Sequence, residues 1–181
     1  MKYVFLTEER SMSTFLSALF KNIFPTLKFR VVHHEGKDDL KKSIINKLKA
    51  HSDANIRVIV LVDQDSSPDC KKLKQNIDDL CKKSGKENYK IRIVCHELES
   101  WYLGDLASID VAFGTNLARD KGKKKYREPD KIANAKQMIK RITKQAGQIY
   151  IASKIGSAMT PESIAENKSK SFQSFLNALD F

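Results

Sequence analysis

Acidic residues follow three separate apolar segments of the chain, and their types and spacing are those of a metal site. Glu8 follows the first segment, Asp63 and Asp65 follow the third, and Glu97 and Glu99 follow the fourth. Because Asp63 and Asp65 are two residues apart, both side chains lie on one side of an extended chain. Gathered carboxylates repel one another unless a cation lies among them, and Mg²⁺ and Mn²⁺ prefer such oxygen ligands. These five residues are therefore predicted to bind Mg²⁺ or Mn²⁺.

The alternative interpretation of acids at strand ends is structural. Asp69 follows Pro68 and is placed to cap a helix, and Glu99 and Asp105 fit the surface of a helix. His96 neighbours the acidic residues, but a packed or supporting histidine is the interpretation that we favour for it.

The apolar segments are predicted β-strands that position these acids. They cover residues 2–7, 29–33, 56–62 and 89–95, and helical patterns follow them near residues 11–24, 38–50, 68–81 and 97–106. This alternation predicts an α/β fold: a mainly parallel, Rossmann-like sheet of about four to five strands with helices on both faces. The carboxyl ends of parallel strands lie at one edge of a sheet, where ligands bind. The acids are therefore expected to meet at that edge.

The C-terminal third has a weaker pattern and is predicted to be a basic, helical addition to the sheet. Residues 114–131 are expected to form a loop, and a helix that ends at Gly147 follows. A short apolar piece at residues 149–152 is predicted to add a strand, and a last helix covers residues 169–179. We expect an α/β core at residues 1–110 and an extension at residues 111–181, packed together as one structural domain.

Positive charge is concentrated in this extension. The chain has 33 basic and 22 acidic residues, a net charge of +11, and residues 119–144 alone contain 11 basic and three acidic residues. Such a surface attracts the phosphate backbone of nucleic acids, with DNA favoured here over RNA, and a solvated helix face is the alternative. The predicted nucleic-acid-binding residues are Lys121, Lys123, Lys124, Lys125, Arg127, Lys136, Lys140 and Lys144.

Several other classes of protein are excluded. The chain has no phosphate-binding G-x-x-x-x-G-K-[ST] loop, no G-x-G-x-x-G dinucleotide motif and no G-x-S-x-G nucleophile motif. Its three cysteines form no C-x-x-C pair, so a zinc knuckle or a disulfide framework is not expected. No apolar run approaches the length of a membrane span, and the N-terminus does not have the pattern of a signal peptide, so a cytoplasmic protein without membrane contact is expected.

The order of the motifs resembles a known family. A glutamate after the first strand and D-x-D after the third resemble the Toprim fold of topoisomerases, primases and OLD-type nucleases. More closely, the chain resembles a bacterial family of small stand-alone Toprim-like proteins that is catalogued as a domain of unknown function. The matching pieces lie at residues 6–12, 62–65, 69–70, 92–105, 126–130, 154–158 and 167–172.

The resemblance implies roles for three residues. Glu8 matches the Toprim glutamate, a metal ligand or general acid/base, and Asp63 and Asp65 match the magnesium ligands of the D-x-D motif. Glu9 departs from the family because a glycine often stands at that position. Topoisomerases also need a catalytic tyrosine on another domain, so strand passage is not expected of this chain. The nuclease branch fits better; its members are often linked to defence against phage or mobile DNA, sometimes beside an ATPase partner.

The leading functional hypothesis is a metal-dependent nuclease. Glu8, Asp63 and Asp65 would be catalytic, and Lys154 is predicted to add positive charge against the transition state. Asn167, Ser169 and Ser171 would orient a phosphate or cap the last helix. A rival hypothesis is a non-enzymatic nucleic-acid-binding or adaptor subunit whose chemistry comes from a partner. A third is a magnesium-dependent phosphatase or receiver-like domain.

Overall fold

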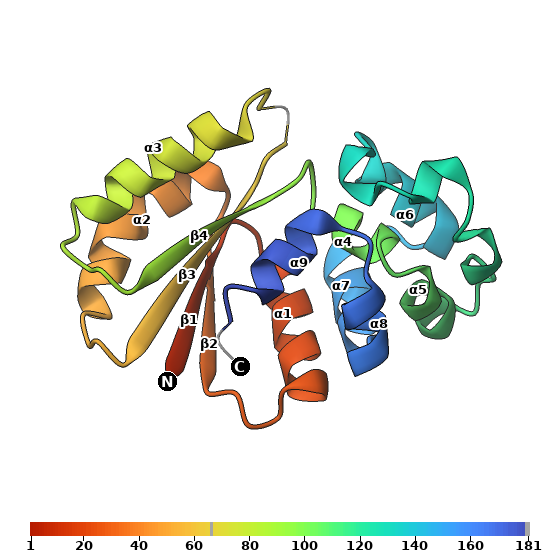
Figure 1. The fold of residues 1–181 in the computed structure, drawn as a ribbon, viewed down its shortest axis with the longest axis horizontal. Helices are drawn as coiled ribbons and strands as arrows, with labels where there is room; N and C mark the ends of the chain where they lie inside the picture. The colour runs from red at the N-terminus through yellow and green to blue at the C-terminus, as the bar shows by residue number, and fades with distance from the viewer. Residues whose placement is uncertain (66, 180–181) are drawn as a thin grey trace.

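A four-stranded, all-parallel β-sheet forms the centre of the computed structural model, which describes residues 1–65 and 67–179. The strands are β1 (Lys2–Thr7), β2 (Phe29–His33), β3 (Ile56–Asp63) and β4 (Tyr89–Val94), and their order in the sheet is β2-β1-β3-β4 (Figure 1). The α/β fold with a parallel sheet is therefore confirmed. All four strands direct their carboxyl ends to the same edge.

Helices cover both faces of this sheet. The α-helices are α1 (Arg10–Ile23), α2 (Lys37–Ala50), α3 (Cys70–Lys82), α4 (Glu99–Leu103), α5 (Leu106–Phe113), α6 (Ala135–Thr143), α7 (Gln148–Ala158), α8 (Pro161–Glu166) and α9 (Lys170–Leu176). Three short 3₁₀ turns, η1 (Ala118–Asp120), η2 (Lys124–Tyr126) and η3 (Pro129–Lys131), lie between α5 and α6. Helices α2 and α3 cover one face, and α1 and α9 cover the other (Figure 1).

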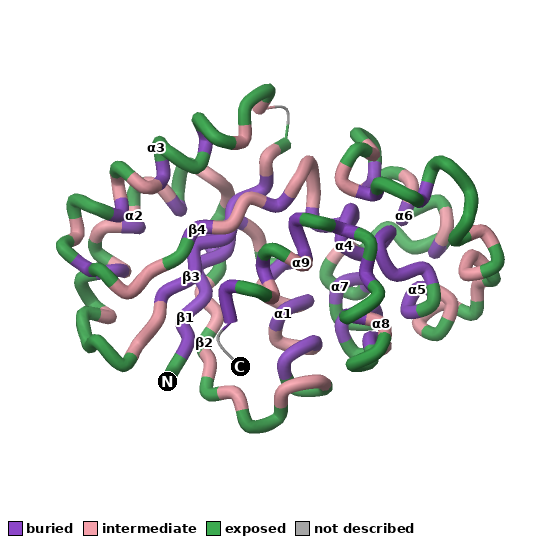
Figure 2. Tube along the Cα trace, viewed as in Figure 1, coloured by how far each residue is buried: buried purple, intermediate pink, exposed green. Residues whose placement is uncertain are grey.

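The alternation of side chains along the strands divides the core into two layers. Val58 and Val60 of β3 pack with the buried residues of α2 and α3, while Ile59 and Leu61 face the opposite layer. Both faces are covered, in keeping with the uninterrupted apolar run at residues 58–62 of β3, and Figure 2 shows the centre of the sheet buried.

The second layer is rich in aromatic rings. Trp101 is fully buried, its ring centroid lies 5.1 Å from those of Phe172 and Phe175, and its Nε1–H donates to Ser171 Oγ at 2.8 Å. Tyr102 is also buried. Trp101 and Tyr102 therefore belong to the core, and these rings attach α4 and α9 to the sheet.

The C-terminal third differs from the prediction in two places. Residues 149–152 form part of α7 rather than a strand, and Gly147 begins that helix rather than ending the previous one. The reason is the spacing of Ile151, Ala152 and Ile155, whose burial follows a helical period that four apolar residues are too few to reveal. Helix α6 ends instead at Lys144, whose φ of 54° is left-handed.

Helix α7 packs closely on α1 at Gly156. A Cβ at this position would lie 2.7 Å from the backbone oxygen of Phe15 and 3.0 Å from Cβ of Ala18, and the backbone of α1 cannot move away cheaply. We expect Gly156→Ala to lower the free energy of unfolding by about 1–3 kcal/mol, as measured by urea unfolding. Gly122→Ala, where a Cβ meets nothing within 4 Å, is the control. An equal decrease in both variants would contradict this packing.

Within residues 1–65 and 67–179, none of the helices is long and apolar enough to cross a bilayer.

Candidate active site

Glu8 and Asp63 meet at the carboxyl edge of the sheet because β1 and β3 are neighbours. The register pairs Thr7 with Leu61, so the residues after Thr7 lie beside the end of β3. The backbone N–H of Asp63 donates to Glu8 Oε2 at 3.2 Å. Both side chains are at least nine-tenths buried, with exposed fractions of 6% for Glu8 and 8% for Asp63.

Asp65 is positioned by strained backbone beyond the end of β3. Its N–H donates to the carbonyl oxygen of His96 at 2.8 Å, and the N–H of Gln64 donates to Val94 O at 2.9 Å. Asp65 and His96 adopt left-handed φ values of 51° and 56°, although neither is a glycine. Such conformations cost on the order of 1 kcal/mol or more and cluster at functional sites. Because of these left-handed conformations, the chain turns at Asp65 and does not continue as an extended strand.

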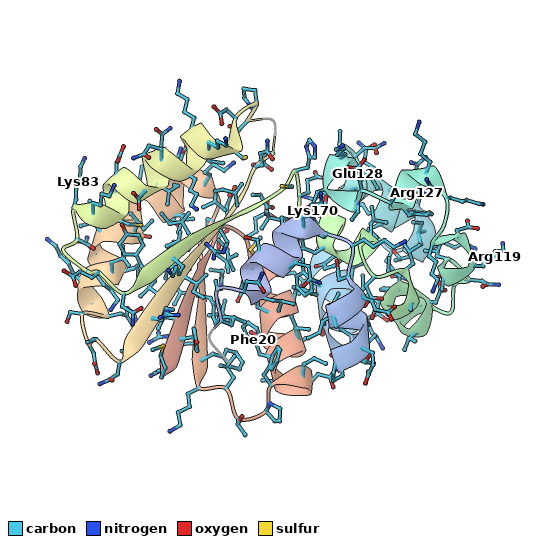
Figure 3. The ribbon with its side chains drawn as sticks, in the orientation of Figure 1. Phe20, Lys83, Arg119, Arg127, Glu128 and Lys170 are labelled. Carbon is cyan, nitrogen blue, oxygen red and sulfur yellow. The ribbon has the colours of Figure 1, made fainter. Side chains whose placement is uncertain are left out.

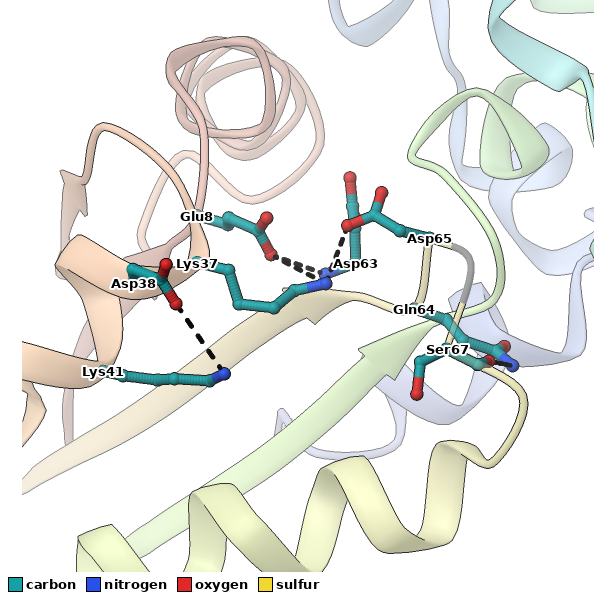
Figure 4. Close-up of polar contacts among 8 residues, drawn as sticks. All are labelled: Glu8, Lys37, Asp38, Lys41, Asp63, Gln64, Asp65 and Ser67. Carbon is teal, nitrogen blue, oxygen red and sulfur yellow. Dashed lines mark hydrogen bonds and ion pairs between the residues drawn. The ribbon is translucent and has the colours of Figure 1, made fainter.

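A lysine lies among these carboxylates. Lys37, the first residue of α2, places its Nζ 2.7 Å from Asp65 Oδ2 and 3.9 Å from Glu8 Oε2 (Figure 4). Burial raises the pKa of Glu8 to about 7, against the lowering effect of Lys37. Burial, followed by the charges of Glu8, Asp65 and Glu99, raises the pKa of Asp63 well above its usual range. Lys37 therefore offsets only part of the effect of burial on the pKa of Glu8.

Asp63 has an unsatisfied atom. Its Oδ1 is buried and has no hydrogen-bond partner among residues 1–65 and 67–179. A buried carboxylate oxygen without a partner is costly, and such atoms in native proteins commonly mark a missing water or ion. Asp63 Oδ1 can therefore bind a cation or carry a proton.

Glu97 and Glu99 lie at the neighbouring end of β4 and differ in their surroundings. Glu97 is half-buried, and its Oε2 accepts the N–H of Lys136 at 2.9 Å, at the beginning of α6. Glu99 is buried at the beginning of α4, and burial raises its pKa. It accepts a long bond of 3.5 Å from Gln148 Nε2. Glu99 is therefore not the surface acid of the alternative interpretation.

Two grooves meet at Asp65. One, of about 560 Å³, is lined by Asp65, His96, Glu97 and Ala133, and it joins the acidic edge to the beginning of α6. The other, of about 490 Å³, is lined by three lysines, Lys37, Lys41 and Lys72, together with Asp65 and Asp69. Basic side chains thus lie beside the acidic edge of the sheet.

The donor set fits a hard divalent cation. Glu8, Asp63 and Asp65 provide carboxylate oxygens only, and no described residue forms a hydrogen bond with Asp63 Oδ1. Within residues 1–65 and 67–179, however, no three His, Cys, Asp or Glu side chains stand in a ready arrangement for a metal ion. The ammonium of Lys37 stands between Asp65 and Glu8, so the carboxylates face a lysine in this arrangement.

The remaining predicted site residues lie farther along the chain and on other elements. Lys154 is exposed on α7, with its Nζ 5.7 Å from the ring centroid of Tyr150. Of the predicted nucleic-acid-binding residues, Lys136 is half-buried and the others are exposed. Figure 3 shows Arg119 and Arg127 pointing outward from the helical part that carries α5 and α6. Lys123 is paired with Asp120 at 2.9 Å, and Lys125 lies over the Tyr126 ring.

Several polar residues near the site have structural roles. Asp69 caps α3 by accepting from the N–H groups of Lys71 and Lys72, which confirms that prediction. Asn167 donates to Trp101 O, and Ser169 caps α9 by accepting the N–H of Phe172. Of the two predicted roles for Ser169, orienting a phosphate or capping the last helix, the observed hydrogen bond is that of a helix cap.

Lys37 is a site residue that the sequence did not reveal. A signal was available: Lys37 begins a helix directly after the strand at residues 29–33, and every such junction in a parallel sheet lies at the carboxyl edge.

The sheet and its acidic carboxyl edge define an α/β protein with a carboxylate cluster at the position where parallel sheets bind ligands. The chain belongs to the family described as "Domain of unknown function (DUF4276)", whose model matches residues 7–180. Its fold is similar to that of the C-terminal region of the Burkholderia pseudomallei OLD protein, with a TM-score of 0.53 and 15% identity over 98% of each chain. No curated protein gives a significant match.

Proposed function

We propose that this protein is a Toprim-type, Mg²⁺- or Mn²⁺-dependent nuclease that hydrolyses phosphodiester bonds. The observation that carries the proposal is the buried Asp63 Oδ1 beside Glu8, which has no partner in the described part of the chain and lies at the carboxyl edge of a parallel sheet. A buried carboxylate pair with raised pKa values is typical of a functional site rather than of a packing solution. The D-x-D motif and the likeness of the fold to an OLD C-terminal region add support.

The roles follow from the surroundings of each residue. Glu8, Asp63 and Asp65 would hold the metal, with Glu97 or Glu99 as a further ligand. When bound, the metal would lower the pKa of a water and neutralise charge on the phosphate. Asp63 is fixed by the end of β3, and Glu8 is held by the N–H of Asp63, so the two oxygens are pre-positioned. Lys154 remains a proposed source of positive charge.

The basic residues of the extension would hold the phosphate backbone. All of them except the half-buried Lys136 are exposed, and Tyr126, the aromatic residue within the basic loop, is buried and not available to stack on a base. Contacts of this kind give affinity without sequence preference. DNA is the preferred substrate, and a role in defence against phage or mobile DNA, beside an ATPase partner, belongs to the same proposal.

Purified protein should be incubated with supercoiled plasmid and with labelled single strands, in Mg²⁺ or Mn²⁺. We expect cleavage that EDTA removes and that Glu8→Ala and Asp63→Ala both abolish. If the wild type binds nucleic acid tightly but never cleaves, the nuclease proposal fails and the adaptor alternative takes its place. That alternative has one observation in its favour, the pairing of Lys37 with Asp65 and Glu8.

Neutralising the basic loop should weaken binding without touching the acidic edge. We expect the combined change of Lys121, Lys123, Lys124 and Lys125 to glutamine to reduce DNA affinity roughly 10–100-fold near 0.1 M salt. The slope of log affinity against log salt should become shallower by up to about 0.9 for each phosphate that is no longer neutralised.

A matched control is needed because the removal of any four positive charges lowers the net charge of the protein and its attraction for nucleic acid. Glutamine at Lys42, Lys49, Lys83 and Lys90 removes four exposed lysines from other elements. An equal effect of both sets would contradict a specific basic surface. Any hydrolysis of a small phosphate ester should be unchanged by either set of substitutions. Hydrolysis of such an ester without cleavage of nucleic acid would favour the phosphatase alternative.

A further inference from the structure

We propose that the ammonium group of Lys37 is a built-in counter-ion of the carboxylate site, which a divalent cation must displace from Asp65 in order to bind. The inference rests on the proposed metal site and deepens it, because it assigns a regulating residue to that site. Two contacts carry it: Lys37 Nζ lies 2.7 Å from Asp65 Oδ2 and 3.9 Å from Glu8 Oε2 (Figure 4).

The position of Lys37 is fixed by the backbone that surrounds Glu8. The N–H of Gly36 donates to the carbonyl oxygen of Glu8 at 3.0 Å, and Gly36 adopts a φ of 109°, which favours glycine. The N–H of His34 donates to Thr7 O at 3.1 Å. The chain therefore turns around Glu8 itself before α2 begins, and Lys37 is delivered to the carboxylates by this turn.

A second set of contacts attaches α2 to the end of β1. The two ring nitrogens of buried His34 lie 2.9 Å from Thr7 O and 2.7 Å from Ser43 Oγ, so the ring bridges β1 and the second turn of α2. Lys37 therefore extends from an anchored helix, and its side chain is only 21% exposed. This is not the situation of a freely moving surface lysine.

The helix itself gives no reason for a lysine at this position. The beginning of a helix carries partial positive charge and favours acids, which α2 supplies at Asp38 and Asp39. A cation at the first position is unfavourable there unless a stronger partner holds it. The carboxylates of Asp65 and Glu8 are that partner, so the residue is explained by the site and not by the helix.

Ammonium and metal compete for the same oxygens. A divalent cation bound by Asp65 and Glu8 repels the ammonium and takes the oxygen lone pairs that it uses. Once displaced, Lys37 opens toward the groove that it lines with Lys41 and Lys72. The expected consequence is a metal affinity that is lowered by Lys37 and a metal-free state that is stabilised by it.

The test measures binding rather than cleavage. The wild type, Lys37→Met and Lys41→Met should be compared. The affinity of each for Mn²⁺ and Mg²⁺ should be determined by titration calorimetry, and the change in its Tm on addition of metal by thermal unfolding. Lys41→Met is the matched control because Lys41 lines the same groove and its Nζ lies 3.9 Å from Asp38, away from Asp65. We expect Lys37→Met to bind metal at least tenfold more tightly and Lys41→Met to change less than twofold. Without metal, Lys37→Met should melt at a lower temperature.

Lysine side-chain NMR gives an independent readout. The ammonium signal of Lys37, identified by its absence in Lys37→Met, should shift on titration with diamagnetic Mg²⁺, while that of Lys41 stays in place. Wild type and Lys37→Met with equal metal affinity would overturn the inference and leave the nuclease proposal standing. Absence of metal binding in both would overturn the metal site and the inference together. Tighter binding by Lys37→Met without any cleavage would support the inference and count against the nuclease.

Discussion

Asp63→Asn is expected to abolish metal-dependent cleavage and, at the same time, to make the metal-free protein more stable at neutral pH. Removal of residues that merely support a metal ligand typically costs 10–100-fold, so removal of a ligand should reduce the cleavage rate by at least about 100-fold. Asp63 is also buried beside Glu8 and Asp65, and its Oδ1 has no hydrogen-bond partner in the part of the chain that the structure describes. Asparagine keeps the shape and removes the charge.

The expected gain in stability is on the order of 1 kcal/mol, within the range that stabilising substitutions commonly reach. It should be measured by urea unfolding at pH 7.5 in EDTA, with the cleavage assay run on the same samples. Asp79→Asn is the control, because Asp79 is an exposed acid on α3 and lies outside the site. A variant that loses both activity and stability would indicate that Asp63 is a structural residue whose ionised form the fold requires.

The fold was predictable because the strands of this sheet are buried on both faces. Residues 56–62 are apolar without interruption apart from Arg57, which identifies a central strand, and helices with clear apolar stripes separate the four strands. The same logic placed Glu8 beside Asp63, since acids that follow parallel strands meet at one edge. The contact between them depends only on the adjacency of β1 and β3.

Lys37 and the backbone strain at Asp65 were not predictable, and the reason is physical. Nothing in the residue types announces a left-handed φ at Asp65 or at His96, because both conformations are imposed by the bonds between the loops after β3 and β4. The pairing of Lys37 with Asp65 joins residues 28 positions apart and depends on the turn around Glu8. The predicted strand at residues 149–152 was wrong for a different reason, because so short an apolar run fits a helix and a strand equally well.

The stability of the metal-free protein should fall as the pH rises from about 4.5 to 8, and Glu8 should account for a large part of the fall. Burial raises the pKa of Glu8 from 4.5 to about 7 in the folded protein. Below pH 4.5 both states hold the proton. Between these values the unfolded chain releases it while the folded protein retains it, so unfolding becomes more favourable as the pH rises. The shift corresponds to at most about 3 kcal/mol.

Glu8→Gln isolates this contribution because the amide oxygen can still accept the N–H of Asp63, while the Asp65–Lys37 ion pair is kept. The variant should match the wild type near pH 4.5 and become the more stable protein by pH 8, in urea unfolding measured in EDTA. The exposed Glu87→Gln should follow the wild type throughout. Parallel curves for Glu8→Gln and the wild type would contradict the raised pKa.

Addition of Mn²⁺ should reverse the trend for the wild type alone. A metal binds the ionised form of Glu8, so its stabilising effect should grow as the pH rises through 7. In Glu8→Gln that growth should be smaller, because one ionisable ligand is absent. The loss of stability in the metal-free protein and the affinity that would hold the cation thus have the same origin, the burial of Glu8 and Asp63 at one edge of the sheet.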